Sequence, residues 1–371
     1  MELLINGKNA FPAILCRIRE AKTSVFVNMF IWRKDRIGDL LAGELLAAAN
    51  RGVRVTVVKD RYGVICECCE ESRQSFFHKR TTVSENIRIR ALRSLYGRGV
   101  PVPAAPDPAA ADAEDLSAAL LRHPMITVQA ADNRYDHSKF WIFDDRILIL
   151  GGINVEDKEN GCDLSGREYR DCMMLLDDPE TVSRFLAMRT DPRDHADPMF
   201  SMNLREPIRY FHAEEDYLRL IGAAEKTLTV VMAYFSPLPA FEAAILRAAE
   251  RGVSVRVLIP ERANFQNDLN RKTVSRLMKK SRGTVRIFLS PAMVHTKLVM
   301  SEKTVSFGSA NLTKKAFHQL GELNLILSAS DDGYRALEAC ADGLFSEARE
   351  VFHPKDVPYR PLMAAAEGVF I

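Results

Sequence analysis

Two stretches of the chain resemble each other and decide its fold: YDHSKFWIFDDRILILGGINVEDKE at residues 135–159 and VHTKLVMSEKTVSFGSANLTKKAF at residues 294–317. Each begins with an HxK triplet and continues into apolar residues that favour a strand. A short polar turn follows, and a second apolar run returns into a G[GS]xN sequence. The pattern predicts two β-hairpins of one design, one in each half of the chain.

The repeat extends upstream of both hairpins. AAANRGVRVTVV at residues 47–58 matches AAERGVSVRVLI at residues 248–259, and EAKTSVFVNMF at residues 20–30 matches AEKTLTVVMAYF at residues 224–235. The apolar spacing predicts helix, strand, helix and strand before each hairpin, hence an α/β fold with a largely parallel sheet covered by helices. We therefore assign residues 1–200 to one half and residues 201–371 to the other.

The first half is longer than the second because it carries an insertion at about residues 62–132. The chain from Arg51 to His137 is about twice as long as the chain from Arg251 to His295. Within the insertion, GRGVPVPAAPDPAAADAED at residues 97–115 is rich in Pro, Ala and acidic residues, which predicts a loop or a disordered linker.

The hairpins supply two copies of one polar set, and six residues are candidates for catalysis: His137, Lys139, Asn154, His295, Lys297 and Asn311. The spacing of two residues would place each histidine and its lysine on one face of a strand. Lysine and asparagine can hold the nonbridging oxygens of an anionic phosphodiester. One neutral imidazole can attack phosphorus, while a second, protonated imidazole donates a proton to the leaving alkoxide.

Small residues and acids complete the predicted site. We expect four positions to bring backbone close to the phosphate, namely Gly151, Gly152, Gly308 and Ser309. Asp171 and Glu322 each precede an apolar strand downstream of a hairpin, where a carboxylate could hold a histidine through Nδ1. An ordinary charge at a strand entry is the alternative for both acids. The chemistry requires no metal and no cofactor.

Composition limits the class of protein. The 371 residues carry a formal net charge of +2, which is too small for a nucleic-acid binder that relies on bulk charge. Seven cysteines, an odd number, argue against a disulfide framework and favour a reducing compartment. For the cluster of Cys66, Cys68 and Cys69, free thiols are favoured over a zinc site. We expect no signal peptide and no membrane-spanning segment.

The motifs resemble the HxKxxxxDxxxxxxG[GS]xN signature of the phospholipase D superfamily. The first copy fits completely and includes Asp144, an acid that is mostly structural in this family. The second copy has Ser301 or Glu302 at that position and a turn shorter by one residue, which leaves the geometry of that hairpin open. The superfamily fold implies two α/β/α sandwich halves related by pseudo-twofold symmetry, with the active site between them.

Longer segments resemble bacterial cardiolipin synthases, among them GGINVEDKE, AYFSPLPAFEAAILRAAERGVSVRVLIPER and GSANLTKKAFHQLGELNLIL. The resemblance implies a phosphatidyltransferase that works through a phosphohistidine, with His137 favoured as the nucleophile and phosphatidylglycerol as the substrate. A phospholipase D-type hydrolase, a phosphatidylserine synthase and a nuclease of the same superfamily stay open. A noncatalytic binding module is disfavoured, because neither HxK motif lacks its His or its Lys.

A lipid substrate implies contact with a membrane surface. We expect a cytoplasmic protein that associates peripherally with the inner face of the cell membrane. The insertion is the expected docking segment, through its apolar pair Phe76-Phe77 and the basic residues Arg88, Arg90, Arg93 and Arg98. A loop that merely caps the domain is the alternative, and the sequence leaves the oligomeric state open.

Overall fold

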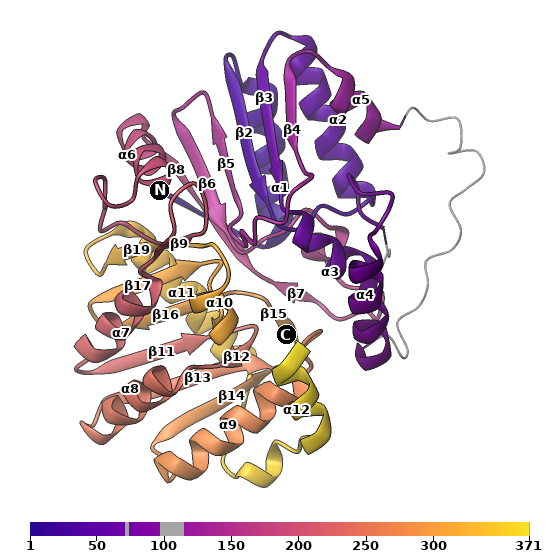
Figure 1. Cartoon of the computed structure of the whole chain (residues 1–371). Helices are drawn as coiled ribbons and strands as arrows, with labels where there is room; N and C mark the ends of the chain where they lie inside the picture. The colour runs from indigo at the N-terminus through magenta and orange to yellow at the C-terminus, as the bar shows by residue number, and fades with distance from the viewer. Residues whose placement is uncertain (71–73, 97–114, 371) are drawn as a thin grey trace.

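The computed structural model describes residues 1–70, 74–96 and 115–370, and shows two large sheets with helices around each (Figure 1). The first sheet has the strand order β1-β8-β6-β5-β2-β3-β4. Its elements are β1 (Glu2–Ile5), α1 (Asn6–Glu20), β2 (Ser24–Met29), α2 (Arg36–Asn50), β3 (Arg54–Lys59), β4 (Ile126–Gln129), β5 (Phe140–Phe143), β6 (Ile147–Gly151) and β8 (Cys172–Asp177), followed by α6 (Pro179–Thr190).

The second sheet has the order β10-β9-β19-β17-β16-β11-β13-β14-β20. Its strands are β9 (Phe200–Leu204), β10 (Tyr210–Phe211), β11 (Thr227–Val231), β13 (Ser254–Pro260), β14 (Val285–Ser290), β16 (Leu298–Ser301), β17 (Thr304–Gly308), β19 (Glu322–Ser328) and β20 (Arg349–Val351). The helices of this half are α7 (Ala213–Ala223), α8 (Pro239–Glu250), α9 (Asn267–Ser281), α10 (Lys314–His318), α11 (Asp332–Glu347) and α12 (Pro361–Phe370).

The two halves repeat one topology. The run β1-α1-β2-α2-β3 of the first half recurs as β9-α7-β11-α8-β13 in the second, and β2 pairs with β3 in parallel as β11 does with β13. Gly52 and Gly252 directly follow the C-cap residues of α2 and α8 and have φ values of +93° and +88°, a conformation that glycine adopts without strain. The α/β class predicted from the repeat is therefore confirmed, as are the two similar halves that the resemblance implied. A division at residues 200 and 201 would separate Phe200 from the rest of β9, and it stays a proposal.

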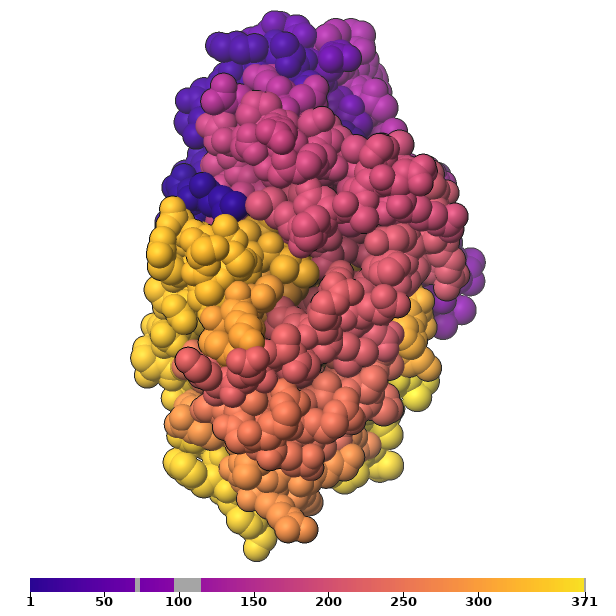
Figure 2. All heavy atoms as spheres, turned by 90° about the vertical axis from the view of Figure 1, so that its left-hand side faces the viewer, coloured from indigo at the N-terminus to yellow at the C-terminus, as the bar shows by residue number. Residues whose placement is uncertain are grey.

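Three large buried cores stabilise the described part of the molecule. One lies between the first sheet and α1 and α2, and a second lies between the second sheet and α7, α8 and α9. The third joins the halves: its members come from both sheets and from α6 and α11. Figure 2 shows one side of this junction, where the N-terminal residues in indigo border the yellow atoms of the second half. Close approach of Met1 and Met174 to Gly333 on α11 agrees with that view.

The insertion is shorter than the sequence suggested. Its predicted end, residues 116–129, contains α5 (Leu116–Arg122) and β4, and β4 pairs in parallel with β3 as β14 does with β13. These elements therefore belong to the repeated fold. The added helices within the expected range are α3 (Val64–Cys69) and α4 (Val83–Tyr96). The predicted linker at residues 97–115 lies, except for its last residue, outside the described residues.

The expected docking pair Phe76-Phe77 is not available to a membrane. Phe76 is 1% exposed, and both rings pack against the buried Trp32. The guanidinium of Arg93 already donates to the carbonyl of Cys68, so it is not free to bind a lipid headgroup. That part of the prediction is wrong: the apolar pair serves the core, which is the commoner role of a large aromatic side chain. Arg88 and Arg90 are exposed, and Arg98 lies outside the described residues.

Candidate active site

The two HxK triplets lie just before strands β5 and β16 rather than within them, so the expected placement on a strand face is corrected. Each triplet is held by the opposite half of the molecule. The backbone N–H of His137 donates to the carbonyl of Gly321 at 2.7 Å, and the N–H of His295 donates to the carbonyl of Arg170 at 2.7 Å. This exchange brings both histidines to the junction between the halves.

The imidazole–carboxylate pairs are exchanged in the same way. His137 Nδ1 lies 3.2 Å from Glu322 Oε2, and His295 Nδ1 lies 2.8 Å from Asp171 Oδ2. Asp171 directly precedes β8 and Glu322 begins β19, which are equivalent strands of the two halves. Each acid therefore contacts the histidine of the other hairpin. With Nδ1 engaged, Nε2 of each ring is left for chemistry.

Both lysines are buried behind the histidines. The ammonium of Lys139 donates to the carbonyl of His137 at 2.5 Å, and the ammonium of Lys297 donates to the carbonyl of His295. Lys297 Nζ is also 3.9 Å from Asp171 Oδ2. Burial, together with Lys297, lowers the pKa of Lys139 to about 7, and burial lowers the pKa of Lys297.

The two asparagines occupy equivalent positions. The side-chain oxygen of Asn154 accepts from the N–H of Ile31 at 3.3 Å, and that of Asn311 accepts from the N–H of Tyr234 at 3.2 Å. The carbonyl oxygen of each amide is thereby fixed. Its NH₂ group stays available as a donor to a phosphate oxygen.

The predicted phosphate contacts of the G[GS] pairs are not possible through backbone N–H groups. The N–H groups of Gly151, Gly152, Gly308 and Ser309 donate to the carbonyls of Lys139, Cys172, Lys297 and Leu323, respectively. These positions instead make room for the acids. A Cβ on Gly152 would lie 2.3 Å from Asp171 Oδ2, whereas the Ser309 hydroxyl donates to Glu322 Oε2 at 2.5 Å.

The hairpin turns are anchored by one acid each. Asp144 accepts from the backbone N–H groups of Lys22, Thr23 and Ser24. Glu302 accepts from the equivalent groups of Glu225, Lys226 and Thr227. The open question about the second hairpin is thus answered: the shorter turn is matched by a longer side chain. For Glu302, desolvation raises the pKa, but the backbone donors together outweigh it and lower the pKa to about 2.

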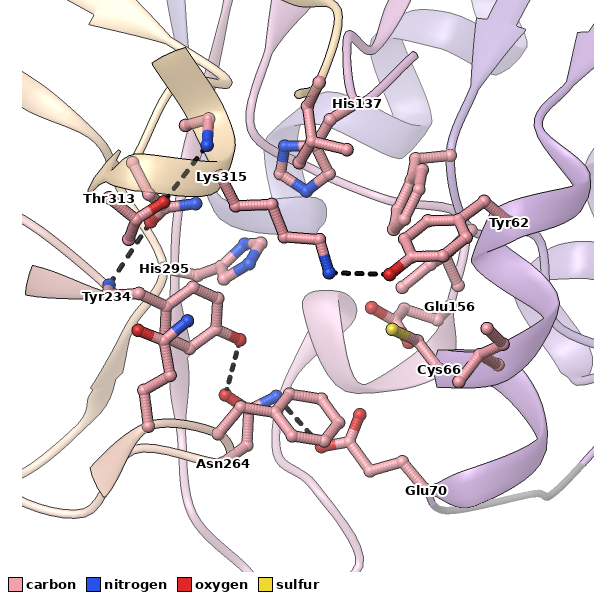
Figure 3. Close-up of a pocket in the computed structure, with 18 of the residues that line it drawn as sticks. Tyr62, Cys66, Glu70, His137, Glu156, Tyr234, Asn264, His295, Thr313 and Lys315 are labelled. Carbon is pink, nitrogen blue, oxygen red and sulfur yellow. Dashed lines mark hydrogen bonds between the residues drawn. The ribbon is translucent and has the colours of Figure 1, made fainter. Parts of the chain in front are cut away.

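One pocket between the halves contains both histidines (Figure 3). Its walls come from both halves and from α3 and α4 of the insertion. Three lining groups have a buried polar atom without a hydrogen-bond partner in the described chain, namely Glu159, Tyr169 and Glu322. A buried polar atom without a partner is costly, so these atoms favour a polar ligand or water in the pocket.

Burial and charge give the two histidine–acid pairs different properties. Desolvation, reinforced by the buried lysines, lowers the pKa of His295 to about 4 and the pKa of His137 well below its usual value. Burial raises the pKa of Glu322 to about 8. Burial acts on Asp171 too, but Lys297 and the His295 contact outweigh it and lower the pKa of Asp171. Asp171 is thus the ionised partner, and Glu322 is largely neutral near pH 7.

Sequence comparison agrees with this geometry. Residues 14–188 and 217–339 match the family described as "Cardiolipin synthase, PLD-like domain". The chain belongs to this phospholipase D-like family. It is 27% identical over 369 residues to cardiolipin synthase A of Pseudomonas syringae pv. syringae (strain B728a), covering 95% of this chain and 69% of that protein.

Two solved structures share the fold of this phospholipase D-like chain. Phosphatidylserine synthase of Haemophilus influenzae Rd KW20 aligns over 98% of this chain and 91% of its own, with a TM-score of 0.68 and 15% identity. Polyphosphate kinase of Porphyromonas gingivalis aligns over 99% of this chain and 52% of its own, with a TM-score of 0.56 and 13% identity. At these identities the likeness concerns the fold alone.

The phospholipase D-like site contains groups that the motifs did not reveal. Lys315 reaches Tyr62 across the pocket, and a hydrogen-bonded chain links Tyr234, Asn264 and Glu70 (Figure 3). Glu70 continues into a buried network with Arg33 and Lys158. Tyr62, Glu70 and Asn264 come from helices and loops without a repeated pattern. Tyr234 lies in the repeated segment 224–235, and Lys315 lies four residues after Asn311, so these positions offered a signal.

A set of potential metal ligands also lies at the site, although the chemistry predicted from the sequence requires no metal. Ligand atoms of Glu159, Asp171 and His295 lie within 4.8 Å of one another. His295 Nδ1 is already bonded to Asp171, and Lys297 supplies a cation beside the same carboxylate. The arrangement therefore suits a charge-paired histidine as well as a metal.

Two further features follow from the side chains and helices. The Cys66, Cys68 and Cys69 thiols are free, as are the other four cysteines. In the described part of the chain, no helix has both the length and the apolar character needed to cross a membrane.

Proposed function

We propose that this chain is a phosphatidyltransferase that acts on phospholipid phosphodiesters through a covalent phosphohistidine. The observation that carries the proposal is the pair of imidazoles at one pocket, each held through Nδ1 by a carboxylate from the opposite half. Holding Nδ1 sets the tautomer and aims Nε2 at the substrate. Two such rings are what an exchange of one alcohol for another requires.

The difference between the acids supports distinct roles for the histidines. Desolvation and Lys297 lower the pKa of His295 to about 4, but the ionised Asp171 at 2.8 Å raises it, so His295 is the more easily protonated of the two rings, which suits the general acid. A largely neutral Glu322, shared with the Ser309 hydroxyl, favours a neutral imidazole at His137, which suits the nucleophile.

The reaction then proceeds in two balanced steps. His137 Nε2 attacks phosphorus, the bond from phosphorus to the leaving oxygen breaks, and His295 gives that alkoxide its proton. The acceptor hydroxyl next gives its proton to His295 and attacks phosphorus, and the phosphorus–nitrogen bond breaks. The buried cations Lys139 and Lys297, together with the amides of Asn154 and Asn311, stabilise the charge that develops on the phosphate oxygens.

Phosphatidylglycerol is the proposed donor and acceptor, which makes cardiolipin and glycerol the products. Support comes from the similarity to cardiolipin synthase A along nearly the whole chain. Water as the acceptor would give hydrolysis, and serine would give phosphatidylserine, so the acceptor is the finer part of the proposal.

The test is lipid mass spectrometry after purified protein is mixed with phosphatidylglycerol in detergent. We expect cardiolipin and glycerol, with no loss of activity in a chelator. Phosphatidic acid alone would indicate a hydrolase, and phosphatidylserine formed only with added serine would indicate a serine transferase. Cleavage of DNA or RNA, with all lipids unchanged, would contradict the proposal and favour a nuclease.

We also propose that the protein docks peripherally on an anionic membrane, at the inner face of the cell membrane, through α4. Val83 and Ile87, four residues apart on this helix, are 78% and 65% exposed, and Arg88 and Arg90 beside them are exposed too. Leu92 of the same helix lines the pocket. Each basic residue near an anionic surface contributes about 1 kcal/mol.

Sedimentation with phosphatidylglycerol vesicles tests the docking surface. The double variant Val83→Ser/Ile87→Ser should pellet less than wild type at low salt, while its turnover of detergent-dispersed substrate stays unchanged. Leu362→Ser/Val369→Ser on α12 is the matched control, because those side chains are 87% and 81% exposed. Equal pelleting of both variants and wild type would remove α4 from the proposal.

A further inference from the structure

Lys315 occupies a special place on the short helix α10, directly after the second G[GS]xN motif. The Thr313 hydroxyl accepts from the N–H of Ala316 and begins the helix. From this start, Lys315 extends into the pocket that contains both histidines, whereas its neighbour Lys314 is exposed (Figure 3).

The ammonium of Lys315 has a neutral partner. It donates to the Tyr62 hydroxyl at 2.6 Å and lies 4.9 Å from the centre of that ring. Among the residues that the structure describes, no carboxylate lies within ion-pair distance of it. The other lysines of the site already have partners. Lys139 and Lys297 donate to the backbone carbonyls of His137 and His295, and Lys158 forms ion pairs with Glu70 and Glu156.

A phosphodiester in this pocket brings a negative charge among buried groups, and a charge-assisted hydrogen bond is about twice as strong as a neutral one. The long, flexible lysine stem allows the ammonium to exchange the phenol for a phosphate oxygen. Lys139 and Lys297 lie behind the histidines and do not line the pocket, whereas Lys315 does.

We propose that Lys315 binds a nonbridging oxygen of the phosphodiester that is cleaved, and that Tyr62 holds the ammonium in the empty pocket. Lys315 is thus a substrate-binding cation that comes from the second half. Without substrate, it donates a hydrogen bond to Tyr62 of the first half. This inference rests on the proposed function, since it assigns the phosphate receptor of that reaction.

Calorimetric titration with inorganic phosphate tests the binding without turnover. For Lys315→Met, which keeps the apolar stem, we expect binding weaker by about 10- to 100-fold. Lys315→Arg should recover most of the affinity, and Lys314→Met is the matched control that should bind as wild type does. Wild-type protein that binds no phosphate, or equal affinity for Lys315→Met and wild type, would overturn the inference.

Turnover distinguishes the phosphate that Lys315 contacts. Lys315→Met should lower kcat/KM for the donor lipid by a similar factor with water, glycerol or phosphatidylglycerol as the acceptor. A loss confined to phosphatidylglycerol as the acceptor would assign Lys315 to the acceptor phosphate and contradict the assignment to the cleaved one. An inactive wild type that still binds phosphate through Lys315 would refute the proposed function and leave the anion site standing.

The variant Tyr62→Phe tests whether the Tyr62 hydroxyl holds Lys315 when no phosphate is bound. The variant removes the hydroxyl that competes with phosphate and leaves the ring in place. We expect phosphate affinity equal to that of wild type or higher. A loss as large as that of Lys315→Met would mean that the two residues act as a structural tie between the halves.

Discussion

The two hairpins share a backbone design and differ in the chemistry around their histidines. The first hairpin has a longer turn with the shorter acid Asp144, and the second has a shorter turn with the longer acid Glu302. Each acid accepts from three equivalent backbone N–H groups. At the rings, His295 has an ionised aspartate beside Gly152, while His137 has a largely neutral glutamate bonded to Ser309. In the turns, the change in side-chain length offsets the change in turn length, so the two hairpins keep one geometry. The acids at the histidines differ in charge, which allows the two histidines to have different roles.

Removing each ring should produce the largest effects. We expect His137→Ala and His295→Ala each to lower turnover of phosphatidylglycerol by about 10⁴-fold or more, because nucleophile and acid act as a unit. A donor that carries p-nitrophenol needs no proton at its leaving oxygen. Its burst of p-nitrophenolate, followed by absorbance, should return in His295→Ala and stay absent in His137→Ala. The reverse pattern would exchange the two roles.

The acids should differ in the same direction. Asp171→Asn removes the ionised partner of His295, and we expect a loss in kcat of about 10²- to 10⁴-fold. Glu322→Gln replaces a largely neutral group with a neutral one of equal shape, so a loss of about 10-fold or less is expected. Steady-state kinetics of both folded variants makes the comparison, and equal losses would refute the asymmetry.

The pH dependence of stability provides an independent readout for Glu322. Burial raises the pKa of Glu322 to about 8, so the folded state holds a proton that the unfolded state has lost above its ordinary carboxyl value. Stability from this group therefore falls as pH rises toward 8. Relative to wild type, Glu322→Gln should gain Tm between pH 5 and pH 8. A constant difference across that range would contradict the raised pKa.

Much of this site follows from sequence because local spacing determines it. The strands of both hairpins coincide with the apolar runs that predicted them. In the first hairpin, Asp144 and Asp145 form the turn with positive φ. Asp171 and Glu322 could be selected because each precedes a strand. Their exchange between the halves could not be predicted, since it depends on how two separate sheets meet.

Other predictions failed for physical reasons that single residues make clear. From sequence alone, a buried Phe76 cannot be distinguished from an exposed aromatic residue that binds lipid. The contact with Trp32, which places Phe76 in the core, is visible only in the structure. The four residues Ile126–Gln129 of β4 are too short for periodicity to separate them from a loop. The G[GS] pairs suggested open backbone, but their N–H groups already donate to backbone carbonyls, and an approach of these residues to the phosphate stays a prediction.

Exchanging the small residues beside the acids tests the break in symmetry. Gly152→Ser places a side chain against the Asp171 carboxylate, and we expect a loss of activity comparable to that of Asp171→Asn. Ser309→Gly removes one hydrogen bond to Glu322, so a loss of a few-fold, about 2- to 10-fold, is expected. Circular dichroism of both variants controls for folding, and a harmless Gly152→Ser would show that the close packing is not required.

Changes in the turns should affect stability and leave catalysis intact. Glu302→Asp shortens the anchor in the shorter turn, and we expect a loss of about 1–3 kcal/mol in the free energy of unfolding, by urea titration. Asp144→Ala should have a loss of the same order. In both variants, kcat per folded molecule should equal that of wild type. Lower kcat at unchanged stability would mean that the turns position the histidines directly.

The most direct test of the central claim is to trap the phosphoenzyme. Wild type and His295→Ala are mixed with donor lipid labelled at phosphorus and bearing p-nitrophenol, quenched in alkali, digested and sequenced by mass spectrometry; His137→Ala is treated in parallel. We predict label on His137 in the first two proteins and none in the third. Label on His295, or no labelled histidine in any of the three, would contradict the account.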